Sequence, residues 1–108
     1  METKTNKEFF IEKYGEAQIS AWKQQYGNIF CYKTTDGKSC VLRPADLITL
    51  DACRVTAGRS SIKFDMALVE NCWLGGDKEL LSIDKYRMGL FDWLGGIIQK
   101  IEGELEEF

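Results

Sequence analysis

The chain has 108 residues, of which 44% are hydrophobic and 29% charged, a composition typical of a single globular domain over residues 1–108. Its net charge is −3, and its 14 lysines and arginines are scattered along the sequence. A DNA- or RNA-binding surface concentrates basic residues, so we expect no nucleic-acid partner. The sequence leaves open whether residues 1–15 pack on the domain or form a loosely attached helix.

The sequence also indicates a compartment. Residues 1–7 are polar and no apolar secretory segment follows them, while no stretch approaches the roughly 18 apolar residues of a membrane span. We therefore expect a cytoplasmic protein with no membrane partner. In such a reducing compartment the four cysteines should remain thiols, with a disulfide between Cys31 and Cys40 as the alternative.

Two short helices are expected first. Thr5 and Glu8 have the spacing of a capping box, which predicts a helix from about Asn6 to Tyr14. Gly15 interrupts it, and the apolar periodicity that follows predicts a second helix over residues 16–25.

A β-hairpin is expected next, because residues 29–34 and 39–43 are rich in strand-forming side chains. Asp36-Gly37 suits a two-residue type I′ turn, which would place Cys31 opposite Leu42. That register assigns four side chains to the core face: Ile29, Cys31, Cys40 and Leu42.

Two further helices should follow the hairpin. Pro44 suits the first turn of a helix that Gly58 would end. Ser60 or Ser61 can cap the next helix, which should reach about Leu74.

The last helix is expected to be long, starting after Ser82 and running over residues 83–108. Gly95 and Gly96 interrupt its pattern, and each costs roughly 1 kcal/mol relative to alanine. Glutamates crowd its C-terminal end, which makes that end either a solvated tail or an acidic docking segment for a basic partner. The fold class is α+β: one β-hairpin packed with four or five helices, including this long C-terminal helix.

The residue types give little support for catalysis. The chain contains no histidine, the commonest general base. Neither a phosphate-binding loop nor the spacing of a zinc or calcium site is present. We therefore expect no enzyme activity, no catalytic residue, no metal and no cofactor. A thiol enzyme is the alternative, and it would require a cysteine with a lowered pKa.

Protein partners remain as the expected ligands. The candidate contact residues share an apolar stripe of the expected last helix: Leu90, Trp93, Leu94, Ile97, Ile101 and Leu105. For Trp93, as for the other tryptophans, packing in the core is the default expectation. Arg43 is a further candidate, either as an anchoring ion pair or as a stem packed along Phe30.

A family resemblance sharpens this expectation. It rests on a series of short motifs over residues 16–108: Trp22-Lys23, Tyr26-Gly27, Leu42-Arg43-Pro44, Glu70-Asn71-Cys72-Trp73-Leu74-Gly75-Gly76-Asp77 and Ile101-Glu102-Gly103-Glu104-Leu105. Their order resembles small phage and prophage proteins described as tail assembly chaperones or tail-associated proteins. The resemblance implies a non-enzymatic protein that binds the tape measure protein or another tail component. The alternative is a generic structural or regulatory module of bacterial or prophage origin that forms a homo-oligomer.

Overall fold

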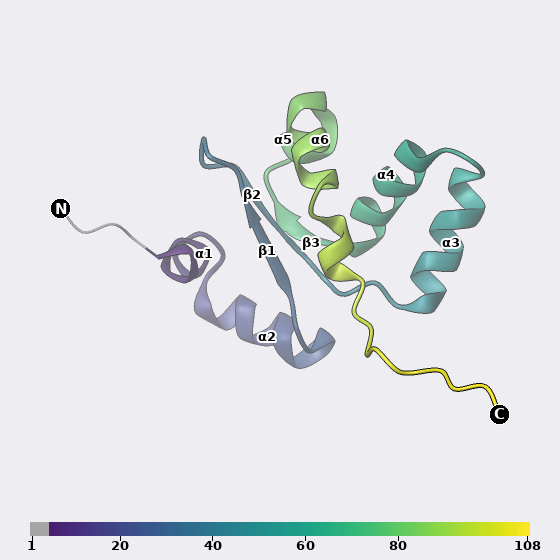
Figure 1. Ribbon diagram of the computed structural model, residues 1–108. Helices are drawn as coiled ribbons and strands as arrows, with labels where there is room; N and C mark the ends of the chain where they lie inside the picture. The colour runs from purple at the N-terminus through teal and green to yellow at the C-terminus, as the bar shows by residue number, and fades with distance from the viewer. Residues whose placement is uncertain (1–4) are drawn as a thin grey trace.

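A computed structural model describes residues 5–108 of the chain (Figure 1). Six α-helices and a three-stranded antiparallel sheet make up most of this part, which confirms the α+β class. The strand order is β1-β2-β3, so β1 and β3 are the sheet edges. The elements are α1 (Asn6–Tyr14), α2 (Glu16–Tyr26), β1 (Phe30–Lys33), β2 (Ser39–Leu42), α3 (Leu47–Ala57), α4 (Ser61–Cys72), β3 (Trp73–Gly76), α5 (Glu79–Ser82), α6 (Asp84–Phe91) and the 3-10 helix η1 (Leu94–Ile97).

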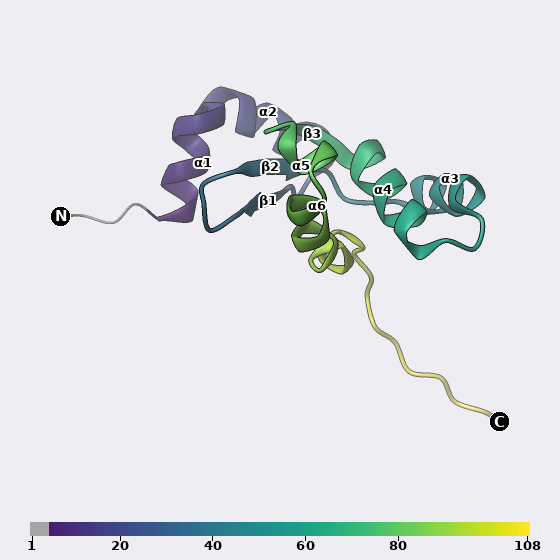
Figure 2. The same cartoon turned by 90° about the horizontal axis from the view of Figure 1, so that it is seen from above.

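Helices cover both faces of the sheet (Figures 1 and 2). Tyr14 of α1 and Trp22 of α2 approach Gly75 from one side, so α1 and α2 cover that face. The main core fills the other face, where Cys40 and Leu42 pack with side chains of α4, α5, α6 and η1. All four residues of the central strand β2 are therefore buried.

The two N-terminal helices form as expected. The Thr5 hydroxyl accepts a hydrogen bond from the N–H of Glu8 at 3.2 Å, which confirms the N-cap of α1. Gly15 has a φ of 87°, a left-handed conformation that suits glycine, and it ends α1 immediately before α2 begins.

The hairpin is present, but its predicted turn and register are wrong. The N–H of Thr34 donates to the Lys38 carbonyl at 2.7 Å, which closes a three-residue loop in which Gly37 alone has positive φ. This longer loop moves the register by one residue, so Cys31 faces Val41 rather than Leu42. Because side chains alternate along a strand, the shift also exchanges the faces of β1.

The consequence for β1 is that Phe30 and Tyr32 pack toward the main core, while Cys31 is exposed. The assignment of Cys31 to the core is wrong. Cys31 and Cys40 belong to opposite faces of the sheet, and both are free thiols.

Helix α3 begins later than expected. Pro44 precedes the helix, and the Asp46 side chain caps it by accepting the N–H of Thr49 at 2.8 Å. The next helix, α4, is capped by the Ser60 hydroxyl, which accepts the N–H of Lys63 at 3.1 Å, as expected.

Strand β3 was not expected from the sequence, which predicted the end of a helix and a turn at these residues. Helix α4 stops at Cys72, and the following four residues pair with β2. Gly76 makes this pairing possible: its φ is 146°, and an added Cβ would lie 2.5 Å from the Cα of Cys40 and from the Ser39 carbonyl oxygen.

The expected long C-terminal helix is wrong as well. Helix α6 ends at Phe91, η1 ends at Ile97, and residues 98–108 form an extended tail (Figure 1). Ser82 ends α5 rather than capping a long helix, and it donates to the Lys78 carbonyl. The glycine pair and the terminal glutamates, both unfavourable to helix, account for the early end. Within residues 5–108, no helix combines the length and apolar character needed to cross a membrane.

Candidate functional site

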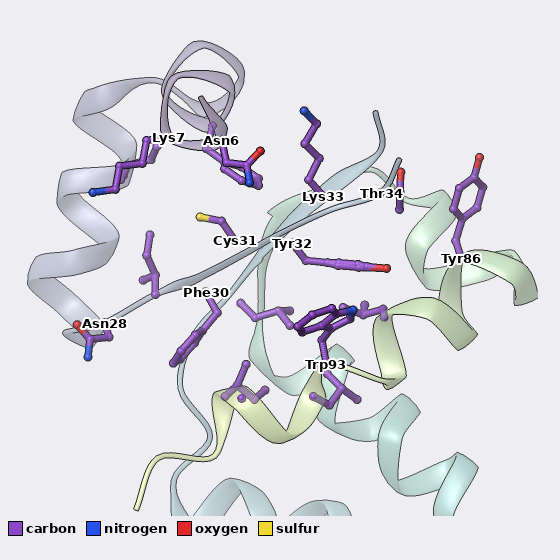
Figure 3. Close-up of a pocket in the computed structure, with 18 of the residues that line it drawn as sticks. Asn6, Lys7, Asn28, Phe30, Cys31, Tyr32, Lys33, Thr34, Tyr86 and Trp93 are labelled. Carbon is purple, nitrogen blue, oxygen red and sulfur yellow. The ribbon is translucent and has the colours of Figure 1, made fainter. Parts of the chain in front are cut away.

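A groove of about 1310 Å³ runs between the α1–α2 pair and the α6–η1 segment. Strand β1 crosses its floor (Figure 3). We refer to this feature as the β1 groove. It is bounded by α1 and α2 on one side and by α6 and η1 on the other, so segments far apart in sequence enclose it.

The floor of the β1 groove is an unpaired strand edge. The Thr34–Lys38 hydrogen bond fixes which residues of β1 bond to β2: the even-numbered ones, Phe30 and Tyr32. The N–H and C=O groups of Cys31 and Lys33 therefore point away from β2. No strand among residues 5–108 pairs with this edge, so four backbone hydrogen-bonding groups face the groove.

One wall of the β1 groove is aromatic. Phe30, Tyr32 and Trp93 all line this wall; in the view of Figure 3 Trp93 lies below Tyr32, and Phe30 points toward the other end of the groove. Trp93 is 72% exposed, so the default expectation that it packs in the core is wrong. An exposed tryptophan beside buried apolar residues is typical of a binding surface.

The opposite wall is basic. Lys7 and Lys23 come from α1 and α2, and Lys33 extends from β1 on the same face of the sheet (Figure 3 for Lys7 and Lys33). None of these three lysines forms an ion pair with a carboxylate among residues 5–108. We call them the lysine wall. Lys85 of α6 lies farther along the groove.

Asp36 is the single acidic residue among the described groove-lining side chains. Its carboxylate accepts hydrogen bonds from the hydroxyls of Thr34 and Tyr86. These bonds lower the pKa of Asp36 below its usual value and raise that of Tyr86. Asp36 thus connects the hairpin loop to α6 through its hydrogen bond with Tyr86.

The lysine wall is held against the sheet by a polar cluster. Asp77, just after β3, accepts hydrogen bonds from the Lys13 ammonium of α1 and from the N–H of Ser39 at 2.9 Å. Lys13 lowers the pKa of Asp77. The hydroxyls of Tyr14 and Ser39 are 2.9 Å apart, and burial raises the pKa of Tyr14 to about 12. This cluster fixes α1 relative to the groove floor.

The structure separates the residues that the sequence grouped on one stripe. Leu90, Trp93, Leu94 and Ile97 all border the β1 groove, and three of them are buried. Ile101 and Leu105 do not join them; they are fully exposed on the extended tail, because the helix that would have aligned them is absent.

Arg43 lies outside the groove. Its guanidinium donates to the Pro44 carbonyl and to the Thr49 hydroxyl, each at 3.1 Å. Its backbone N–H donates to the Cys72 carbonyl at 2.8 Å. No ion pair of Arg43 occurs within residues 5–108, so its contacts connect β2 to the start of α3 rather than to a charged partner.

The pKa shifts of the thiols are opposite in direction to that of an activated cysteine nucleophile, whose pKa is lowered. Burial raises the pKa of all four cysteines, that of Cys40 to about 12. Cys31 is the exposed one, yet the surrounding groove still desolvates its thiol. A raised pKa reduces the thiolate fraction on which thiol chemistry depends. In the described part of the chain, no three Cys, Asp or Glu side chains are arranged to hold a metal ion.

A second apolar surface lies on α3, and sequence reasoning did not single it out. Leu47, Ile48 and Val55 are exposed by 83%, 82% and 77%. The helix buries smaller residues instead, Thr49 and Cys53 among them. We call the exposed set the α3 surface.

Comparison with known proteins assigns neither surface. No family model, no curated protein and no solved structure matches the chain significantly. The resemblance to tail assembly proteins therefore stays a prediction.

Proposed function

We propose that this chain is a non-enzymatic cytoplasmic protein-binding domain that takes an extended segment of another protein into the β1 groove. The segment adds as a strand to the outer edge of β1. The observation that carries this proposal is the unpaired edge of Cys31 and Lys33 on the floor of a groove. Strand addition to an exposed sheet edge is a recurring mode of peptide recognition, in which backbone hydrogen bonds provide affinity and flanking pockets provide specificity.

The two walls define the chemistry of the bound segment. Side chains of an added strand alternate between the faces of the sheet. Those on the face of Phe30 and Tyr32 would meet the aromatic wall, to which Trp93 also belongs. Those on the face of Cys31 would meet the lysine wall. The groove therefore suits a segment in which apolar and acidic residues alternate.

A role in phage tail assembly is one form of this proposal. It follows from the sequence resemblance alone, and it requires the tape measure protein or another tail component to present such a segment. The alternative form is a structural or regulatory module of bacterial or prophage origin whose groove binds other copies of the chain. Both forms use the same groove, so they differ only in the partner.

A quantitative pull-down from cells of the native host, with resident prophage induced, tests the proposal. The decisive variant is Cys31→Pro, which removes an N–H that faces the groove and leaves the hydrogen bonds to β2 intact. Cys31→Ala is its matched control, because it changes the same side chain and keeps the N–H. We expect Cys31→Pro to lose partners that the wild type and Cys31→Ala both capture.

The outcome that would overturn the proposal is equal capture by Cys31→Pro and Cys31→Ala. Trp93→Ala provides a second test if the proline impairs folding, since this exposed side chain contributes little to the core. A tail component among the groove-dependent partners would support the tail-assembly form, and its absence with capture of other proteins would oppose that form.

A further inference from the structure

The tail after η1 carries a strand pattern without a strand partner. Residues 99–108 are exposed, with Ile101 at 100% and Leu105 at 98%. Over residues 101–106 the sequence Ile-Glu-Gly-Glu-Leu-Glu alternates strictly between non-polar and acidic residues. Such alternation is typical of a half-buried β-strand. No strand of residues 5–108 pairs with the tail.

The alternation matches the two walls of the β1 groove. In an extended conformation Ile101 and Leu105 lie on one face, and the glutamates at 102, 104 and 106 lie on the other. We propose that the β1 groove binds residues 101–106 of a second copy of this chain. The tail pairs with the outer edge of β1, its apolar face toward Trp93 and its glutamates toward the lysine wall. This inference rests on the proposed function and names its partner.

Charge favours this occupant. The tail after η1 contains four glutamates and one lysine. The described groove lining contains four lysines and one aspartate, and that aspartate, Asp36, is already hydrogen-bonded to Thr34 and Tyr86. The two surfaces are therefore opposite in charge within one molecule. Attraction between exposed charges weakens with ionic strength, so association should be salt-sensitive.

The geometry favours a second copy over the same chain. The N–H of Ala45 donates to the carbonyl of Ile97 at 3.0 Å, which fixes the point where the tail starts. From there the tail leads away from α1 and α2, the helices that carry Lys7 and Lys23 (Figures 1 and 2). It would have to reverse direction to enter its own groove, whereas the groove of a neighbouring copy requires no reversal.

A charge exchange in the full-length chain tests this contact. The tail-reversed variant carries Glu102→Lys, Glu104→Lys and Glu106→Lys. The groove-reversed variant carries Lys7→Glu, Lys23→Glu and Lys33→Glu. All six positions are exposed, so both variants should fold. Sedimentation velocity at low salt should show concentration-dependent association of the wild type and association at least about tenfold weaker for each variant alone.

Mixing the two variants provides the specific result. Each reversed surface then meets a complementary one, and we expect association to return in the equimolar mixture. In the same mixture the amide resonances of Cys31 and Lys33 in the ¹⁵N-labelled groove-reversed variant should become protected from hydrogen exchange. A control variant with Arg59→Glu, Lys63→Glu and Lys78→Glu has the same net charge as the groove-reversed variant. It should associate like the wild type, because these exposed positions lie outside the groove.

Three results would overturn the inference. The wild type could remain monomeric at all concentrations with unprotected Cys31 and Lys33 amides. The mixture could fail to restore association. A monomer whose Cys31 and Lys33 amides lose protection only in the tail-reversed variant would instead place each tail in its own groove. If one of these results is found while Cys31→Pro still abolishes capture of another protein, only the inference fails and the proposed function stands. If no capture depends on the groove, both fail.

Discussion

The β1 groove and the α3 surface both expose large apolar side chains; in Figure 1, α3 lies at the far end of the molecule from α1 and α2, which bound the groove. The two surfaces differ in the polar side chains and backbone groups that lie beside the apolar side chains. The groove is concave and combines aromatic side chains with lysines and unpaired backbone groups at Cys31 and Lys33. On α3 the middle of the helix has its backbone hydrogen bonds within the helix, and the surface offers apolar side chains with the exposed Asp51 on the same face.

Because of this difference, only the groove restricts the kind of partner that it can bind. Apolar area drives association without direction. Unpaired N–H and C=O groups require a strand, and the lysine wall requires negative charge, so together they restrict the partner's conformation and composition. The α3 surface imposes neither restriction, and nothing in the structure shows what covers it.

The largest effect should come from the sheet on which the groove is built. Gly76→Ala would place a Cβ 2.5 Å from backbone atoms of Cys40 and Ser39. We expect a loss of about 3 kcal/mol in the free energy of unfolding, measured by urea denaturation. Gly95→Ala is the matched control, since nothing lies within 4 Å of its Cβ position. Equal stability of the two variants would contradict the observed pairing of β2 with β3.

The next effect separates the two surfaces. Trp93→Ala should weaken capture of the partner about tenfold or more, because an exposed tryptophan in a groove is a typical binding anchor. Replacing Leu47 and Ile48 of the α3 surface by serine should leave groove-dependent capture unchanged. Both variants should keep the free energy of unfolding within about 0.5 kcal/mol, since these side chains are exposed. If the α3 variant lost capture and Trp93→Ala kept it, the α3 surface rather than the β1 groove would be the binding site.

A smaller, pH-dependent effect should come from Asp77, which holds the lysine wall through Lys13 and Ser39. Its folded-state pKa is lowered, first by the hydrogen bond from Lys13. The stability it contributes is therefore present above the unfolded-state pKa of about 3.9 and is lost as the pH falls through the lower folded-state value. Asp77→Asn should flatten the acid side of the stability profile.

The control for this effect is Asp51→Asn on α3, an exposed position outside the groove. Thermal unfolding between about pH 5 and pH 2.5 measures both variants against the wild type. An unchanged acid profile in Asp77→Asn would mean that the contact to Lys13 does not secure α1.

The smallest effect concerns the thiol in the groove. Cys31 is the exposed one of the four cysteines, and its pKa is raised by the surrounding protein. Alkylation of the native chain at neutral pH should therefore modify Cys31 first, at about a few-fold lower rate than in the unfolded chain. Mass spectrometry of the alkylated peptides measures this rate. Faster reaction than in the unfolded chain would revive the alternative of a thiol enzyme.

Local signals in the sequence were sufficient for α1, α2 and the start of α4. Caps at Thr5 and Ser60 and the break at Gly15 depend on neighbouring residues, so they could be predicted without knowledge of the fold. The hairpin was also predictable. Its register was not, because Asp36-Gly37 fits either a two-residue or a three-residue loop, and one residue decides which face of β1 is buried.

Non-local packing explains the remaining errors. Strand β3 pairs with β2, a segment about 35 residues earlier in the chain, because Gly76 allows the two backbones to approach closely. The C-terminal stripe is helical only as far as packing supports it, so Leu94 and Ile97 are buried while the tail is not. The groove itself could not be predicted, since its walls come from distant segments.

Amide hydrogen exchange along β1 shows whether the outer edge of this strand is open. In a dilute ¹⁵N-labelled chain, where the groove is empty, we expect slow exchange at Phe30 and Tyr32 and fast exchange at Cys31 and Lys33. This alternation would establish the open edge on which strand addition depends. Slow exchange at Cys31 and Lys33 with fast exchange at Phe30 and Tyr32 would indicate the two-residue turn, in which the unpaired backbone groups belong to Phe30 and Tyr32. Equal protection at all four would show that the edge is already covered, and either result would contradict the account.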